Sequence, residues 1–120
     1  MLIDCLYVGL GGFAGSVLRY ALGKLLPQGD WPWTTLAINV VGAFCLGALA
    51  ALVARGVITN ERMSLLLRVG VCGGFTTFST LSLEAAGLIS GGQGAAGVAY
   101  LVMSCVLGVV AALAGGAVVA

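Results

Sequence analysis

The sequence predicts an all-α membrane protein, with four transmembrane helices in a single domain that covers residues 1–120. Hydrophobic residues make up 61% of the chain and charged residues only 8%, whereas a soluble domain usually carries about 25% charged residues. So few charges could not cover a water-facing surface, and we therefore expect the chain to lie in a lipid bilayer. With a net charge of +1 and no basic cluster, it is not expected to bind nucleic acid.

Four apolar stretches are each long enough to cross a bilayer core of roughly 30 Å, which takes about 20 residues of helix. We expect these helices at about 2–22, 34–53, 64–88 and 94–119. Trp31 and Trp33 precede the second stretch, a position typical of an interfacial aromatic belt. The first stretch begins without basic residues and carries Asp4, so we interpret it as a membrane span and not as a cleaved signal peptide.

The loop charges give little orientation bias. Four spans place Arg55, Arg62 and Arg68 on one side of the membrane and Arg19 and Lys24 on the other. Because the positive-inside rule then separates the two orientations poorly, we expect insertion both ways up and pairing as an antiparallel, dual-topology dimer. The 20 glycines also favour close helix packing and oligomerisation, since small residues let helix backbones approach in lipid.

The third stretch is predicted to be broken. Gly73 and Gly74 come early in the run of 15 uncharged residues between Arg68 and Glu84. Glycine tolerates unwound backbone, which at membrane depth must be buried in protein or line a cavity. A break between residues 73 and 77 would free backbone carbonyls to bind a cation.

Beyond the glycines, the helical period predicts two neighbouring stripes on the third stretch. Their members are Phe75, Phe78 and Ser82 on one stripe, and Thr76, Ser79, Thr80 and Leu83 on the other. Hydroxyl donors and the electropositive edges of aromatic rings suit a small anion. No carboxylate lies within this run, so a cation path is not favoured, but these residue types do not name the ion.

Other polar residues inside the spans can be structural or can line a path. Asn39 either forms an interhelical hydrogen bond or lines a polar path with its N–H groups free to donate to an anion. Arg19 can snorkel, bind a lipid phosphate or cap helix carbonyls, and we favour a structural role over contact with a permeant ion. Tyr100 and Ser104 lie one turn apart on the fourth stretch, while Glu84 is expected at a mouth of the bundle.

Three motifs resemble the fluoride-exporting channels of the CrcB/Fluc family, and the likeness covers essentially the whole chain. The motifs are GGFAGSVLRY (residues 11–20), TLAINVVGAF (35–44) and GGFTTFSTLSLE (73–84). The resemblance implies a fluoride-selective channel in the cell (inner) membrane that exports toxic fluoride passively. It further implies an antiparallel homodimer with two pores, each lined by both subunits, and a central structural sodium ion.

The resemblance also implies roles for individual residues. The fluoride pore would be lined by eight of them: Phe78, Leu81, Asn39, Ser79, Thr80, Thr35, Tyr100 and Ser104. The sodium ion would be held by the backbone carbonyls of Gly73 and Thr76, and Arg19 and Glu84 would be structural or vestibule residues. This chain departs from the family pattern at Leu81, where a second phenylalanine is typical, and at Gly108, where a serine is frequent.

The alternative reading is a small proton-coupled multidrug exporter of dual topology. That mechanism needs a carboxylate deep in the membrane, and here the first span has only Asp4 at its edge. A subunit that only assembles would not need hydroxyl and aromatic stripes beside a glycine break. An enzyme is least expected, because the chain has no His, and its four Cys lie in separate spans without metal-ligand spacing.

Overall fold

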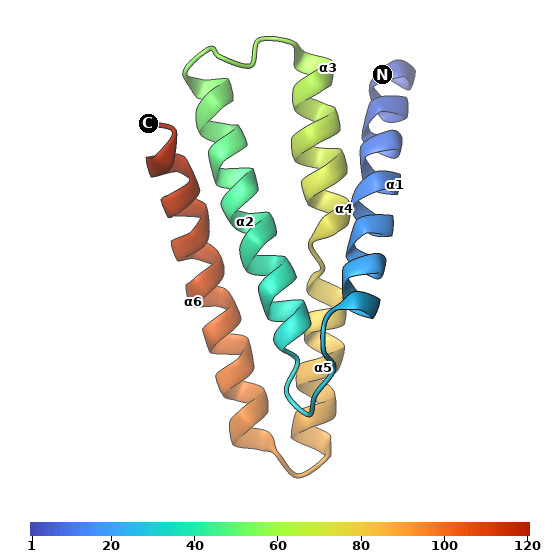
Figure 1. Ribbon diagram of the computed structural model, residues 1–120, viewed down its shortest axis with the longest axis vertical. Coiled ribbons are helices and arrows are strands. Elements are labelled where there is room, and N and C mark those ends of the chain that lie inside the picture. The colour runs from blue at the N-terminus through green and yellow to red at the C-terminus, as the bar shows by residue number, and fades with distance from the viewer.

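The computed structural model describes residues 1–120 and consists of helices joined by short turns (Figure 1). In chain order the elements are α1 (Leu2–Leu25), α2 (Trp33–Ala54), α3 (Glu61–Ser64), η1 (Leu65–Cys72), α4 (Gly73–Phe75), α5 (Phe78–Ser90) and α6 (Gly94–Val118). Together α3, η1, which is π-helical, and α4 form one rod, and α5 completes the third span after a two-residue break. Four spans are long and apolar enough to cross a membrane, which confirms the predicted fold class.

The break in the third span falls on two threonines. Thr76 (φ −84°, ψ 157°) and Thr77 (φ −149°, ψ 118°) are extended, a conformation that β-branched residues favour. The hydroxyl of Thr77 then caps α5 by accepting a hydrogen bond from the Thr80 N–H at 3.2 Å. The break therefore lies within the predicted interval, but the unwound residues are threonines and not glycines.

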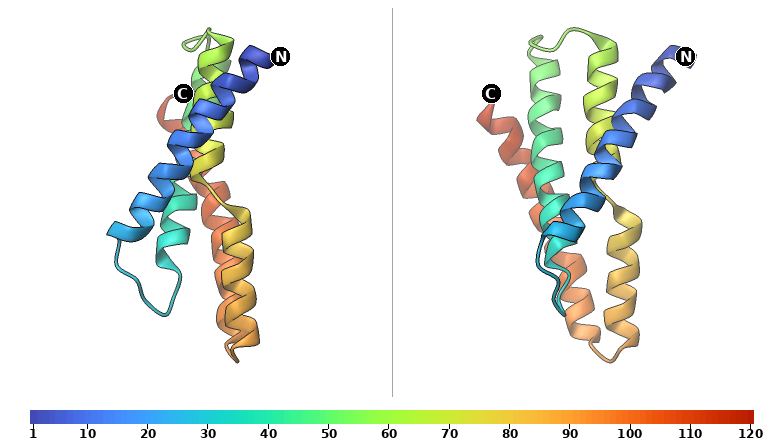
Figure 2. Two further views of the ribbon diagram at one scale, coloured as in Figure 1. Left: turned by 90° about the vertical axis from the view of Figure 1, so that its right-hand side faces the viewer. Right: turned by 45° about the vertical axis from the view of Figure 1, so that its right-hand side comes forward.

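Gly70 and Gly74 of the third span serve close packing against α1, which crosses η1 and α4 (Figure 2). A Cβ atom added to Gly74 would lie 2.7 Å from the carbonyl oxygen of Gly12. One added to Gly70 would lie 2.7 Å from the Cα of Gly11. Both distances are far shorter than real contacts of a Cβ atom. The expectation that Gly73 and Gly74 mark unwound backbone was wrong, because both are helical and Gly74 is needed where two backbones touch.

A second set of contacts joins α2 and α5 to α6. A Cβ atom on Gly47 would lie 2.8 Å from the carbonyl carbon of Ala112, so α2 and α6 also meet through backbone. In contrast, α5 packs on α6 and α2 mainly through side chains, in a core made of Leu36, Leu81, Ala85 and Tyr100. The subunit thus consists of two glycine-packed helix pairs, with α5 attached to the second pair (Figure 1).

Two turns end their helices with glycine in the left-handed conformation. After α2, Gly56 (φ 75°) donates to Val53, and Val57 donates to Leu52. After α5, the same pattern forms around Gly92 (φ 85°). These Schellman-type turns satisfy carbonyls at the helix ends and return the chain at once. The two termini and the turn after α2 consequently lie at one end of the bundle (Figure 1).

Only 16 of the 120 residues are buried within the subunit. The exposed side chains include many large apolar ones, such as Phe13, Val41 and Val109. This surface suits lipid or a second subunit, and not water.

Candidate functional site

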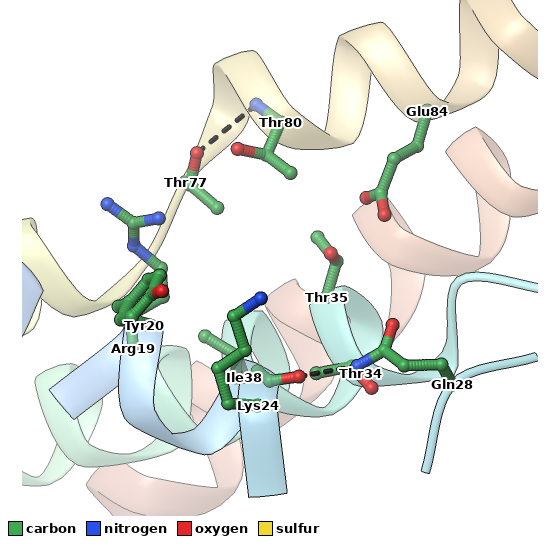
Figure 3. A pocket seen from close by; sticks show the side chains of 11 residues that line it. Arg19, Tyr20, Lys24, Gln28, Thr34, Thr35, Ile38, Thr77, Thr80 and Glu84 are labelled. Carbon is green, nitrogen blue, oxygen red and sulfur yellow. Dashed lines mark hydrogen bonds between the residues drawn. The ribbon is translucent and has the colours of Figure 1, made fainter. Parts of the chain in front are cut away.

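A polar cleft of about 440 Å³ opens between the end of α1, the start of α2, and α5 (Figure 3). Polar and charged side chains line most of it. The lining residues are Arg19, Tyr20, Gly23, Lys24, Gln28, Thr34, Thr35, Ile38, Thr77, Thr80 and Glu84. Such a lining is unusual in a chain with 8% charged residues, so the cleft is the natural candidate for a polar path.

Two cations stand on the α1 side of the cleft. Arg19 donates from Nε to the carbonyl of Gly74 at 3.3 Å, so it caps a backbone group of the third span. This is the structural role expected for Arg19, although the residue also lines the cleft. The ammonium group of Lys24 lies 5.6 Å from the ring centre of Tyr20, a cation–π contact. Positive charge thus borders a cavity rich in hydroxyl groups.

Glu84 faces these cations from α5 (Figure 3). Its Oε1 accepts a hydrogen bond of 3.0 Å from the hydroxyl of Tyr100 on α6, and the ring of Tyr100 is fully buried. The ring of Trp31 packs edge-on against Tyr100, with 5.5 Å between ring centres. Glu84 therefore lies at the mouth of a cleft and has a fixed hydrogen-bond donor.

Asn39 holds the break in the third span. Its Nδ2 donates to the carbonyl of Thr77 at 3.1 Å, and its Oδ1 accepts from the N–H of Thr77 at 2.8 Å. The side-chain amide thereby replaces the helical hydrogen bonds that the extended backbone lacks. Of the two readings of Asn39, the interhelical hydrogen bond is present, and the residue also borders a groove.

This groove, about 280 Å³, lies on the apolar side of the break. Its lining residues are Asn39, Ala43, Leu46, Thr76, Thr77, Phe78 and Leu81. Phe78 is 79% exposed, whereas Leu81 is 7% exposed and also belongs to the core around Tyr100. Phe75 lies before the break and is buried, so the predicted stripe of Phe75 and Phe78 was wrong, because the extended threonines separate them.

The backbone carbonyls of Gly73 and Thr76 accept no hydrogen bond within the chain. In a continuous helix the N–H of Thr77 would reach Gly73, but here it donates to Asn39. Free carbonyl oxygens at a helix break are suitable ligands for a small alkali cation. The donor set present thus fits the cation site that the sequence predicts.

Four predicted site residues line neither the cleft nor the groove: Gly73, Ser79, Tyr100 and Ser104. Ser79 is exposed on α5 and pairs with the hydroxyl of Thr77 at 3.5 Å. Ser104 is buried on α6, and its hydroxyl has no partner. Conversely, Lys24, Gln28 and Thr34 line the cleft but were not predicted. Thr34 adjoins Thr35 at the start of the second span, and that pair was the only signal in the sequence.

Comparison with known proteins identifies the family. The description "CrcB-like protein, Camphor Resistance (CrcB)" matches residues 6–116. The chain belongs to the CrcB family. That match spans all four membrane helices, including the broken third span, and confirms the resemblance found in the sequence motifs.

Several curated relatives are similar over nearly their whole length. A protein of Rhizobium johnstonii named fluoride-specific ion channel FluC is 44% identical over 120 residues, which cover 98% of this chain and 96% of the relative. A protein of the same name from Rhizobium meliloti is 43% identical over 113 residues, covering 92% and 90%. Fluoride-specific ion channel FluC 1 of Carboxydothermus hydrogenoformans is 44% identical over 117 residues, covering 95% and 91%.

Proposed function

We propose that this chain is a fluoride-selective channel through which fluoride leaves the cell passively, down its electrochemical gradient. The observation that carries the proposal is the broken third span, held by Asn39 between a polar cleft and an open groove. Membership of the CrcB family, with relatives named fluoride-specific ion channels, supports the choice of ion. A channel needs no catalytic group, so the function is transport and not enzymatic.

Fluoride is small and strongly hydrated, and the pore must replace its water. Moving an unpaired charge into a medium of low dielectric costs roughly tens of kcal/mol in the Born limit. One charge-assisted hydrogen bond contributes only about 1.5–3 kcal/mol. Several donors in succession are therefore required. The hydroxyls of Thr35 and Thr80 line the cleft, and the ring edge of Phe78 lies at the groove beyond the break.

Tyr100, Ser104 and Ser79 are the remaining candidates for donors along the pore. The hydroxyl of Ser104 is buried without a partner, which makes it available to an anion. Ser79 is exposed on this subunit, so it would face a path shared with a second subunit. Tyr100 already donates to Glu84, and it would position that carboxylate and not solvate fluoride directly.

The proposed assembly is an antiparallel homodimer of dual topology. Free carbonyls and an exposed Phe78 at the break favour coverage by protein, because unpaired backbone groups are not tolerated against lipid. A two-fold axis in the membrane plane would bring two breaks together. The carbonyls of Gly73 and Thr76 from both subunits would then hold one structural sodium ion, which would lower the electrostatic barrier to an anion in both pores.

Ion efflux from sealed vesicles tests the function. Purified protein is reconstituted in liposomes loaded with potassium fluoride, and fluoride release is recorded after potassium is allowed to leave through valinomycin. We expect rapid release of fluoride and, in matched vesicles, no release of chloride above that from empty lipid. Release of neither ion would refute the channel, and equal release of both would refute its selectivity.

The assembly needs its own measurement. Light scattering in detergent should give a protein mass of twice the 11.9 kDa of one chain. Labelling of a single cysteine placed at the C-terminus, in a chain whose own cysteines are replaced, should reach about half of the copies from outside the cell if both orientations occur equally. Labelling of all copies or of none would rule out dual topology.

A further inference from the structure

A second polar cavity lies at the opposite end of the bundle, beside the N-terminus and the turn after α2. Its volume is about 380 Å³, and it is bordered by α1, the end of α2, α3 and η1. The lining residues are Asp4, Val53, Ile58, Thr59, Asn60, Glu61, Ser64, Leu65 and Arg68. We call it the Arg68 pocket. It shares no residue with the cleft or the groove described above.

Arg68 is the one cation in the lining of this pocket, and it has no ion-pair partner. Its guanidinium has no carboxylate within 4.0 Å, and its Nε is buried without a hydrogen-bond partner. The residue lies roughly 10 Å along the third span from Glu61, at a rise of 1.5 Å per residue. A guanidinium at this depth is costly unless it is paired, and an unpartnered buried donor adds to that cost.

The acidic residues of the pocket do not neutralise Arg68. Asp4 is engaged by two other cations: Arg62 at 3.5 Å and the terminal ammonium group at 3.9 Å. Arg62 also lies 5.9 Å from the ring centre of Tyr7, which fixes it on the outer surface. Glu61 is exposed at the start of α3 and forms no ion pair. Arg68 therefore has no ion-pair partner within 4.0 Å, and Glu61 is the one carboxylate of the lining that is also unpaired.

A second donor stands next to Arg68. The Oγ of Ser64 accepts a hydrogen bond of 3.4 Å from an Nη of Arg68, and the Ser64 hydroxyl donates to no group of the chain. The Ser64 hydroxyl is thus a donor without an acceptor in the lining of the cavity, and the buried Nε–H of Arg68 behind that lining also has no acceptor. A fixed cation with two free donors is complementary to an anion.

We propose that the Arg68 pocket is an anion-binding site, separate from the pore residues and centred on the guanidinium of Arg68 with Ser64 as the second donor. The ligand is a compact anion, which is either free fluoride from solution or the phosphate of a lipid headgroup. Because the pocket opens at the membrane surface opposite the cleft, a free anion there would be concentrated at the far end of the molecule. A lipid phosphate would instead anchor the third span to its leaflet.

The sequence offers a direct probe, since the chain contains only four arginines: Arg19, Arg55, Arg62 and Arg68. Labelling arginine with ¹⁵N at Nε gives at most four Nε–H resonances in mildly acidic buffer. Single Gln substitutions of the other three arginines assign the Arg68 resonance by elimination, so no Arg68 variant has to fold. The labelled protein in a neutral detergent is titrated with potassium fluoride or with dihexanoyl phosphatidylglycerol, against potassium gluconate at equal ionic strength.

We expect the Arg68 resonance to shift saturably, several times more than that of Arg62, which carries the same charge on the same face of the membrane. A response to fluoride alone identifies a free anion, and a response to the phospholipid alone identifies a headgroup phosphate. Ser64→Ala should raise the titration midpoint several-fold, because one donor is lost. An Arg68 shift no larger than that of Arg62 with both probes would overturn the proposal, whatever the efflux assay gives, because this readout does not require conduction.

Discussion

The two halves of the third span are built by different rules. Before the break, the rod from Glu61 to Phe75 touches α1 through backbone, and glycine is needed on both sides of the contact. After the break, α5 touches α6 and α2 mainly through side chains, with Leu81 and Ala85 against Tyr100, and its backbone meets a glycine of α6 only at Gly97. The first half is therefore fixed in position and intolerant of added atoms. The second half can adjust its side chains around a polar cleft.

This difference explains where the candidate site lies. The rigid half presents free carbonyls at its end and receives the bond from Arg19 to Gly74. The adjustable half contributes Thr80 and Glu84 to the cleft and Phe78 to the groove. Asn39 joins the halves by binding both backbone groups of Thr77. A transport path at such a junction combines a fixed backbone with side chains that can solvate an ion.

The largest effect on folding is expected from Gly74→Ala, which attacks the rigid half directly. The new Cβ would lie 2.7 Å from the carbonyl oxygen of Gly12, and neither backbone can yield without separating the helices. We expect a loss of about 1–3 kcal/mol or more in the free energy of unfolding, as for overpacked cores. Equilibrium unfolding in mixed micelles measures it.

Gly73→Ala is the matched control for that experiment. Its Cβ would meet only the carbonyl oxygen of Arg68, at 3.9 Å, and it keeps the backbone carbonyl proposed to bind sodium. We expect unchanged or slightly raised stability, because alanine is favoured over glycine in a helix by about 1 kcal/mol. Equal destabilisation by the two substitutions would show that the first half is not packed through its glycines.

The next largest effect, on fluoride efflux, is expected from Asn39→Asp at the junction of the two halves. Aspartate can still accept from the N–H of Thr77, but it cannot donate to the Thr77 carbonyl, and it adds a negative charge beside the proposed path. Fluoride efflux from liposomes should fall to the background of empty lipid. If the variant released fluoride at the unsubstituted rate at neutral pH, the amide of Asn39 would be needed neither to hold the junction nor to line the pore.

Phe78→Ile tests whether the adjustable half supplies a ring edge to the anion. Because Phe78 is 79% exposed, its replacement should leave folding intact and strongly reduce fluoride efflux. Leu83→Ile is the matched control, since Leu83 is 75% exposed on the same helix and lines neither cavity. Similar efflux from both variants would contradict the role of Phe78.

The sequence predicts the four spans and the break between the two halves, but it does not predict what the glycines near the break do. Four spans and a break near Gly73 follow from hydropathy and from local glycine content. The role of Gly74 does not, because it depends on α1 being the neighbour of the rod, and a single sequence does not state which helices are neighbours. Lys24 and Gln28 were missed for the same reason, since the end of α1 and the turn after it reach the cleft only through the packing of the helices.

Leu81 shows a second reason why site residues could not all be assigned from the sequence. Motif comparison placed it in the pore, while the structure shows one side of it in the groove and the other in the core with Tyr100. A side chain with two environments cannot be assigned from its residue type. Free carbonyls near the break were anticipated, because a helix break must leave carbonyls without donors, and the family resemblance assigned them to Gly73 and Thr76.

The smallest effect is expected from Tyr100→Phe, which removes one hydroxyl from the adjustable half. The ring keeps its place against Trp31 and Leu81, and only the bond to Glu84 is lost. A hydrogen bond to a charged group contributes about 1.5–3 kcal/mol, and Glu84 recovers part of this from water in the cleft. We therefore expect a modest loss of stability and a few-fold change in fluoride efflux, because the carboxylate becomes free to move toward Lys24. Tyr100→Leu, which also empties the core, should be much more damaging to folding. If Tyr100→Phe were as damaging as Tyr100→Leu, the second half would depend on its hydrogen bond more than on its packing, and the contrast between the two halves would fail.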